Sequence, residues 1–239
     1  MSGSDSAILK RAAATRALDF VENGMKLGLG TGSTAEAFLE VLAPRVRGGL
    51  TVTGAATSER TAIKARGLGI PIALLEQLAP LDLTIDGADE ADRSLTLIKG
   101  GGGALLREKL VASASKRMVV VADGTKLVQK LGRFPLPVEV VEFGHTITAM
   151  RIAQAAAELG YSGPRIVLRM QEGVPVRTDG GNLIYDCALG SIGNAVKVAT
   201  MLKSITGVVE HGLFVGLATT LVIAHAADKI EILERKTDA

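Results

Sequence analysis

The sequence contains no tryptophan, and aromatic residues make up only 3% of its 239 residues. Proteins that bind single-stranded nucleic acid without sequence preference stack the bases on aromatic side chains, so this scarcity argues against that class. Charge is nearly balanced, with 27 basic and 25 acidic residues and a net charge of +2. A nucleic-acid-binding protein usually carries a clear basic excess. We therefore expect no nucleic-acid partner.

Cysteine and long apolar segments are also scarce. Cys187 is the single cysteine, so an internal disulfide is excluded and a reducing compartment is expected. The N-terminus lacks the basic region and apolar run of a signal peptide. No uninterrupted apolar stretch approaches the ~20 residues needed to cross a bilayer. We predict a cytoplasmic protein with no membrane partner.

Hydrophobic residues make up 47% of the chain, enough for an ordinary core, and their pattern alternates between strand and helix in the first half. Strands are predicted at 25–29, 50–54, 71–75, 81–85 and 117–122. Helices are predicted at 7–21, after Ser33, at 61–68 and at 104–112. Such alternation is typical of a mainly parallel sheet covered on both faces.

The second half has a different order of elements. The pattern predicts a strand at 138–141, a helix at 146–159, a strand at 165–170, a hairpin over 174–186 that turns at 179–182, a helix at 191–204 and a strand at 207–210. This order resembles a split βαβ, ferredoxin-like module. A later strand at 220–224 is expected to rejoin the first sheet. We predict a Rossmann-like α/β domain (1–135 and 213–239) interrupted by a smaller ferredoxin-like α+β domain (136–212).

A first glycine motif follows the strand at 25–29. Gly30-x-Gly32-x-x-Ala35 fits a dinucleotide fingerprint, but no acidic residue ends the next strand, where a nicotinamide site needs one. Ser33 and Glu36 have capping-box spacing, which places the helix start inside the motif. The hydroxyls of Thr31, Ser33 and Thr34 at a helix N-terminus favour a single phosphate monoester. The alternative, a tight turn with Ser33 as a plain N-cap, stays open.

A second group of residues combines carboxylates, lysines and glycines. Asp86-Gly87-Ala88-Asp89-Glu90 follows the predicted strand 81–85, at the edge where open α/β sheets bind ligands. The run Lys99-Gly100-Gly101-Gly102-Gly103 leaves backbone N–H groups uncovered, able to approach an anion or a developing oxyanion. Glu108 comes in the first turn of the next helix. This combination indicates acid–base chemistry on a small, oxygen-rich substrate.

Each of these features also has a plain structural explanation. Asp86 and Asp89 can form a turn or bind Mg²⁺, although Lys99 already supplies a positive charge nearby. A Glu108–Lys109 pair on a helix is usually part of a solvated face, and a lone Lys99 is usually a surface lysine. His145, His211 and His225 have no metal-ligand spacing, so we predict no metal site.

Together these motifs resemble ribose-5-phosphate isomerases of type A. The resemblance also includes Ala122-Asp123-Gly124-Thr125-Lys126, Phe134-Pro135-Leu136-Pro137-Val138-Glu139-Val140, Thr178-Asp179-Gly180-Gly181-Asn182 and Gly207-Val208-Val209-Glu210-His211-Gly212-Leu213-Phe214. Order and spacing agree over almost the whole chain. Departures are modest: Gly103, Leu106 and Gly180 stand where Ala, Thr and Asn are common, and none removes a group that does chemistry.

The resemblance implies an aldose–ketose isomerase that interconverts ribose 5-phosphate and ribulose 5-phosphate, in the non-oxidative branch of the pentose phosphate pathway. It implies no metal or organic cofactor and a homodimer or homotetramer. It also implies a parallel-sheet domain interrupted by a small α/β domain. The first domain would then bind the sugar phosphate and carry the catalytic residues.

The resemblance also implies residue roles. Glu108 would move the proton between C1 and C2 through an enediolate, whose oxygen Lys99 would neutralise with the N–H groups of Gly100, Gly101 and Gly102. Asp86 would assist ring opening and Asp89 would contact hydroxyls. Further substrate contacts are expected from Thr31, Gly32, Ser33, Thr34, Gly87, Ala88 and Lys126. For Lys10, a phosphate contact and plain helix amphipathicity are equally good explanations.

Two other functions remain open. The first is a related enzyme of the wider superfamily, such as an amino-sugar phosphate deaminase or a coenzyme A transferase, which would use a Glu nucleophile. The second is a non-catalytic sugar-phosphate sensor. A sensor could dispense with Glu108, whereas the full acid–base set is present here.

Overall fold

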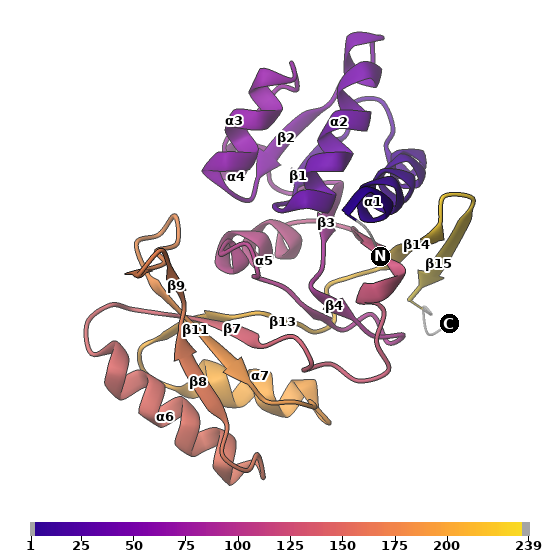
Figure 1. Cartoon of the computed structure of the whole chain (residues 1–239). Helices are drawn as coiled ribbons and strands as arrows, with labels where there is room; N and C mark the ends of the chain where they lie inside the picture. Colours follow the sequence, from indigo (N-terminus) through magenta and orange to yellow (C-terminus); the bar gives the residue numbers. More distant parts are fainter. Residues whose placement is uncertain (1–2, 236–239) are drawn as a thin grey trace.

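In the computed structural model, which describes residues 3–235, a six-stranded sheet has helices on both faces (Figure 1). Its strand order is β15–β14–β6–β3–β1–β2. All neighbours are parallel except β14 and β15, which form an antiparallel hairpin. The strands are β1 (Lys26–Leu29), β2 (Thr53–Ala56), β3 (Leu83–Gly87), β6 (Met118–Asp123), β14 (Thr220–Ala226) and β15 (Lys229–Glu234).

The helices cover the sheet because its strands present apolar side chains alternately to each face. In β6, Val119 and Val121 face α1 (Gly3–Ala17) and α2 (Ser33–Arg47). Met118 and Val120 face the opposite side, the side of α5 (Leu105–Ser113). The remaining elements of this half are η1 (Leu18–Phe20), α3 (Glu59–Gly67), α4 (Leu75–Leu78) and η2 (Gly124–Lys126).

A separate four-stranded antiparallel sheet has the order β12–β7–β11–β8. Its strands are β7 (Leu136–Val140), β8 (Arg165–Leu168), β11 (Leu183–Ala188) and β12 (Val208–His211), and its helices are α6 (His145–Glu158) and α7 (Ala195–Ser204). This is the ferredoxin-like arrangement predicted from the sequence, with its own core. The predicted fold class, a mainly parallel α/β sheet with an inserted α+β module, is confirmed.

The chain also forms two smaller sheets, and one helix contacts both of the larger ones. β4 (Glu90–Ala91), β5 (Leu97–Ile98) and β13 (Leu213–Phe214) form a three-stranded sheet, and β9 (Met170–Gln171) pairs with β10 (Val174–Pro175). α5 contacts β3 of the large sheet as well as β7 and β12 of the small one, and it lies between them in Figure 1. A movement of either sheet would therefore displace α5, which carries Glu108.

The structure corrects three local predictions. No strand covers 71–75: Ile72 makes an isolated bridge to Gly54, and α4 begins at Leu75. The Ser33 capping box is wrong, because the N-cap is Gly32, whose φ of 107° suits glycine, and Ser33 is already helical. The predicted hairpin over 174–186 does turn at 179–182, but its first arm pairs with β9 and only an isolated bridge links it to β11.

None of the helices within residues 3–235 is long and apolar enough to span a bilayer.

Candidate active site

A cleft of about 120 Å³ opens at the carboxyl edge of β1, β3 and β6. β1 has β2 on one side and β3 on the other, so successive strands of the chain are added on opposite sides of β1, and open α/β sheets bind ligands at such points. The cleft is lined by Glu108, by Lys10 and by every residue predicted to contact substrate except Asp86. Motifs spread over more than a hundred residues of sequence therefore meet at one edge of the sheet.

Lys99 lies at the centre of the buried charges. Its ammonium donates to the carbonyl of Gly87 at 2.6 Å and lies 3.0 Å from Asp86 Oδ2 and 3.5 Å from Glu108 Oε2. Only 2% of the side chain is exposed. Burial disfavours the charge, but Asp86 and Glu108 outweigh it and raise the pKa of Lys99. Lys99 is therefore a fixed cation at the wall of the cleft.

Glu108 is a buried carboxylate in the first turn of α5. Burial is the largest influence and raises its pKa to about 8; Lys99 opposes this rise, while Asp86 and Asp89 add to it. Among the described residues, Oε2 of Glu108 has no hydrogen-bond partner despite its proximity to Lys99. A side chain that changes protonation near neutral pH and faces a polar cleft is suited to proton transfer.

Asp86 lies behind the cleft wall and is fully buried at the end of β3. Its Oδ1 accepts from the N–H of Gly87 at 2.7 Å and of Thr31 at 3.2 Å. Burial raises its pKa, and Lys99 partly offsets that rise. Gly30 passes so close that a Cβ there would lie 2.0 Å from Asp86 Oδ1. Glycine at position 30 is therefore required by packing against Asp86.

Asp89 and the glycine loop (residues 100–102) form another wall of the cleft. Asp89 Oδ2 accepts from the N–H of Gly101 at 2.7 Å. Gly100 has a φ of 101°, and a Cβ there would lie 2.9 Å from Leu105 Cβ. The glycine run thus permits a backbone turn that places residues 100–102 at the cleft and brings the N–H of Gly101 to Asp89.

The opposite part of the cleft is rich in groups that bind anions. The N-terminus of the 15-residue helix α2 contributes Gly32, Ser33 and Thr34, and its first N–H groups and dipole favour negative charge. Lys10 of α1 and Lys126 of η2 add two cations. The sequence left the role of Lys10 open; the structure brings it to the cleft.

The hydroxyl of Thr31 is turned away from this group. Its Oγ1 is hydrogen bonded with Thr57 Oγ1, Ser58 Oγ and Thr61 Oγ1 at 2.7, 2.8 and 3.0 Å. This cluster fixes the turn after β1 against the start of α3. Thr31 therefore borders the cleft while its hydroxyl is committed to the protein.

Lys109 is not the solvated neighbour of Glu108 that helical spacing favours. Its ammonium donates to Glu210 Oε1 at 2.8 Å and to the carbonyl of His211 at 2.6 Å, and it lies 5.0 Å from the ring centroid of Phe214. Burial, helped by Lys109, lowers the pKa of His211 to about 4. Lys109 thus ties α5 to β12, which local sequence gave no means of predicting.

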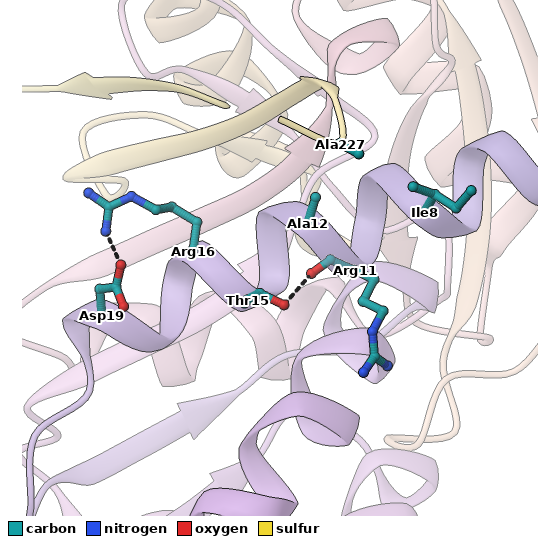
Figure 2. A pocket seen from close by; sticks show the side chains of 7 residues that line it. All are labelled: Ile8, Arg11, Ala12, Thr15, Arg16, Asp19 and Ala227. Carbon is teal, nitrogen blue, oxygen red and sulfur yellow. Dashed lines mark hydrogen bonds and ion pairs between the residues drawn. The ribbon is translucent and has the colours of Figure 1, made fainter. Parts of the chain in front are cut away.

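A second hollow, which shares no lining residue with the cleft, lies between α1 and the turn after β14 (Figure 2). Arg16 pairs with Asp19, and the Thr15 hydroxyl donates to the carbonyl of Arg11 at 2.8 Å. In Figure 2 the guanidinium groups of Arg11 and Arg16 extend away from each other. These charges do not converge on a common point. Within residues 3–235 no group of three or more His, Cys, Asp or Glu side chains is arranged to hold a metal ion.

Comparisons with known proteins match most of the chain to a single enzyme family. Residues 53–228 match the family described as Ribose 5-phosphate isomerase A (phosphoriboisomerase A). Ribose-5-phosphate isomerase A of Nitrobacter hamburgensis is 55% identical over 228 residues, which cover 95% of this chain and 98% of that protein. The protein of the same name from Methylorubrum extorquens is 55% identical over 218 residues, or 91% of this chain and 92% of that one.

Solved structures that resemble this chain include members of the same family. Ribose 5-phosphate isomerase from Plasmodium falciparum superimposes with a TM-score of 0.91 at 37% identity, covering 97% of this chain and 100% of that chain. A D-ribose-5-phosphate isomerase solved in complex with phospho-erythronic acid gives a TM-score of 0.86 at 35% identity, covering 95% and 97%.

Proposed function

The chain belongs to the ribose 5-phosphate isomerase A family and interconverts ribose 5-phosphate and ribulose 5-phosphate, and we propose that Glu108 carries the proton between C1 and C2 of the sugar. The observation that carries this proposal is the buried carboxylate of Glu108, with a pKa of about 8 and an oxygen that makes no hydrogen bond within residues 3–235, 3.5 Å from a buried ammonium. A base whose pKa lies near the working pH transfers protons efficiently in both directions.

The reaction needs one base and one source of positive charge. Ionised Glu108 removes the proton from C2 of open-chain ribose 5-phosphate, and negative charge develops on O1. Protonated Glu108 then returns the proton to C1, while the proton on O2 passes to O1 and C2 becomes the carbonyl. Lys99 and the N–H groups of the glycine loop stabilise the enediolate; one such donor is typically worth ~3 kcal/mol.

The two aspartates have different positions and therefore different proposed roles. Asp86 is fully buried and does not line the cleft, so we propose that it holds Lys99 in place at 3.0 Å. Asp89 lines the cleft and is better placed to exchange hydroxyl protons. We therefore propose that ring opening and hydroxyl contacts both fall to Asp89, with Asp86 acting through Lys99.

The phosphate is proposed to lie at the N-terminus of α2, beside Ser33 and Thr34, with Lys10 and Lys126 supplying charge. All four side chains line the same cleft, and the hydroxyls of Ser33 and Thr34 are oriented by a helix start that suits anions. We propose that no metal is needed, because the ammonium of Lys99 already occupies the place beside Asp86 where a cation would bind.

We also propose the domain boundaries, the cellular location and the oligomeric state of the protein. The chain would divide near 135/136 and 212/213, because β7 begins at Leu136 and the last strand of the small sheet ends at His211. We propose a cytoplasmic enzyme, in keeping with its single, buried cysteine. A homodimer or homotetramer is supported by exposed apolar side chains on the small domain, Phe143, Ile147 and Met150 among them.

The deciding experiment measures ribulose 5-phosphate formation from ribose 5-phosphate by the purified protein with EDTA present. Wild type, Glu108→Gln and the exposed control Glu76→Gln are compared, and the reaction is repeated in deuterium oxide. We expect activity that survives chelation, a loss of at least about 100-fold in Glu108→Gln alone, and solvent deuterium at C1 of the product.

Other results would change the assignment. Undiminished activity in Glu108→Gln would remove Glu108 as the base, and activity lost to EDTA would restore a metal at Asp86 and Asp89. Binding without turnover by the folded protein would favour the sensor, and inhibition by hydroxylamine during turnover would favour an acyl-enzyme mechanism.

A further inference from the structure

Arg169 connects the small sheet to the glycine loop of the cleft. Its Nη1 donates to the carbonyl of Gly100 at 2.8 Å and to that of Gly101 at 3.2 Å. Its Nε and Nη2 donate to the two carboxylate oxygens of Asp186 on β11, at 2.9 and 2.5 Å. Only 14% of the arginine side chain is exposed. Bidentate pairing with Asp186 fixes the plane of the guanidinium and therefore the direction of its third nitrogen.

The two carbonyls that Arg169 binds belong to the peptide units that carry the N–H groups of Gly101 and Gly102. In a planar trans peptide the C=O and the N–H point in opposite directions. A group that holds both carbonyls on one side therefore turns both N–H groups to the other side. Gly101 N–H accordingly meets Asp89 Oδ2 at 2.7 Å. Gly102 borders the cleft, and its N–H has no acceptor within the described residues.

This tether adds to two other hydrogen bonds of the loop, from the N–H of Gly103 to the carbonyl of Gly100 at 3.0 Å and from the N–H of Gly101 to Asp89 Oδ2 at 2.7 Å. Glycine has no side chain to pack and has the widest choice of backbone angles, so consecutive glycines can rotate their peptide planes easily. Two hydrogen bonds from one rigid guanidinium restrict two consecutive planes. The positive charge beside the carbonyls also polarises these peptides and makes their N–H groups stronger donors.

We propose that Arg169, held by Asp186, is a positioning residue of the isomerase that fixes two peptide N–H groups toward Asp89 and the developing enediolate oxygen. The inference rests on the function proposed above and assigns the small domain a part in catalysis. Arg169 itself does not line the cleft. Lysine cannot replace it, because an ammonium lacks the planar fork that pairs with Asp186 while binding two carbonyls.

The test compares wild type with Arg169→Lys, Arg169→Ala and Asp186→Asn. The control is Arg165→Ala, an exposed arginine on β8. Each protein is assayed for kcat, for KM, and for inhibition by phospho-erythronate, whose carboxylate imitates the charged enediolate. Arg169→Ala is also assayed with added guanidinium ion, which can occupy the vacated space.

We expect kcat to fall about 100-fold in both Arg169 variants, as for a small misplacement of a transition-state donor, with KM within about threefold of wild type. Phospho-erythronate should bind more weakly, Asp186→Asn should show a smaller loss, and guanidinium should restore part of kcat in Arg169→Ala. The control should match wild type. If Arg169→Ala fails to fold, Arg169→Lys and Asp186→Asn decide the question.

An unchanged kcat in Arg169→Lys overturns the proposal, and so does an effect on KM alone. A loss of kcat that Arg165→Ala shares also overturns it, because the effect would then not be specific to the loop. If wild type itself does not isomerise ribose 5-phosphate, the proposed function has failed. An active wild type with equally active Arg169 variants contradicts this inference alone.

Discussion

Replacing Glu108 with Gln should make the folded protein more stable at alkaline pH while removing its activity. Glu108 is buried, and burial raises its pKa from 4.5 to about 8. Glutamine resembles the protonated form of glutamate in shape and does not ionise. The substitution therefore removes the cost of placing a negative charge in the core.

The size of the effect follows from the linkage between proton binding and folding. Between pH 4.5 and about 8 the folded protein keeps the proton of Glu108, whereas the unfolded chain has lost it. The unfolded state thus binds fewer protons, and the free energy of unfolding falls as pH rises, by roughly 1.4 kcal/mol per pH unit. The contribution is fully present below pH 4.5 and lost above about 8, a total of about 5 kcal/mol.

The assay is urea unfolding of wild type and Glu108→Gln at one protein concentration, at each pH unit from 5 to 9. The titrating groups that do not interact with Glu108 contribute equally in both proteins, so the difference between the free energies of unfolding reports on residue 108 together with its partners Lys99 and Asp86. We expect this difference to shift by about 4 kcal/mol in favour of Gln between pH 5 and 8 and to level off above. Glu76→Gln, on the surface of α4, should show the same pH dependence of the free energy of unfolding as wild type.

A difference that stays constant from pH 5 to 9 would refute the reasoning, because Glu108 would then titrate near its ordinary pKa. A shift in favour of wild type at high pH would also refute it. That result would mean that the attraction of Lys99 at 3.5 Å outweighs the cost of burial.

Two further predictions concern the same cleft. The value of kcat/KM should rise about tenfold per pH unit below pH 8 and level off above it, because the base must be ionised in the free enzyme; a profile flat from pH 6.5 to 9 would contradict a pKa of about 8 for the base. Gly30→Ala should cost about 1–3 kcal/mol of stability in urea and most of the activity, because its Cβ would lie 2.0 Å from Asp86 Oδ1. Gly67→Ala, with nothing within 4 Å of the added Cβ, is the matched control, and equal effects of the two substitutions would contradict this explanation.

Several features of the fold and cleft could be read from local sequence. Alternation of strand and helix patterns predicted the parallel sheet, and the order of elements after Pro135 predicted the ferredoxin-like module. The position of Glu108 in the first helical turn after a glycine run was also predictable. These features depend on neighbours within a few residues, where side-chain size, branching and glycine freedom act directly on the backbone.

Elements with weak local signals were predicted less well. Pro71 to Leu75 has the composition of a strand, but only Ile72 bridges to Gly54. Ser33 has the spacing of an N-cap, yet the turn after β1 requires the positive φ of Gly32, which moves the helix start by one residue. In both cases the outcome was decided by neighbouring segments that the local pattern does not contain.

The sequence by itself determined which chemical groups the protein carries and on which ends of which elements they lie. Only the tertiary structure decided that Asp86 lies behind Lys99, that Lys10 and Lys126 reach the same cleft, and that Arg169 holds the glycine loop. The pKa of Glu108 belongs to this second class, because it is set mainly by desolvation, and desolvation is the sum of all elements packed around the carboxylate. Contacts between residues far apart in the chain depend on how the sheets and helices assemble, and no short stretch of sequence records that assembly.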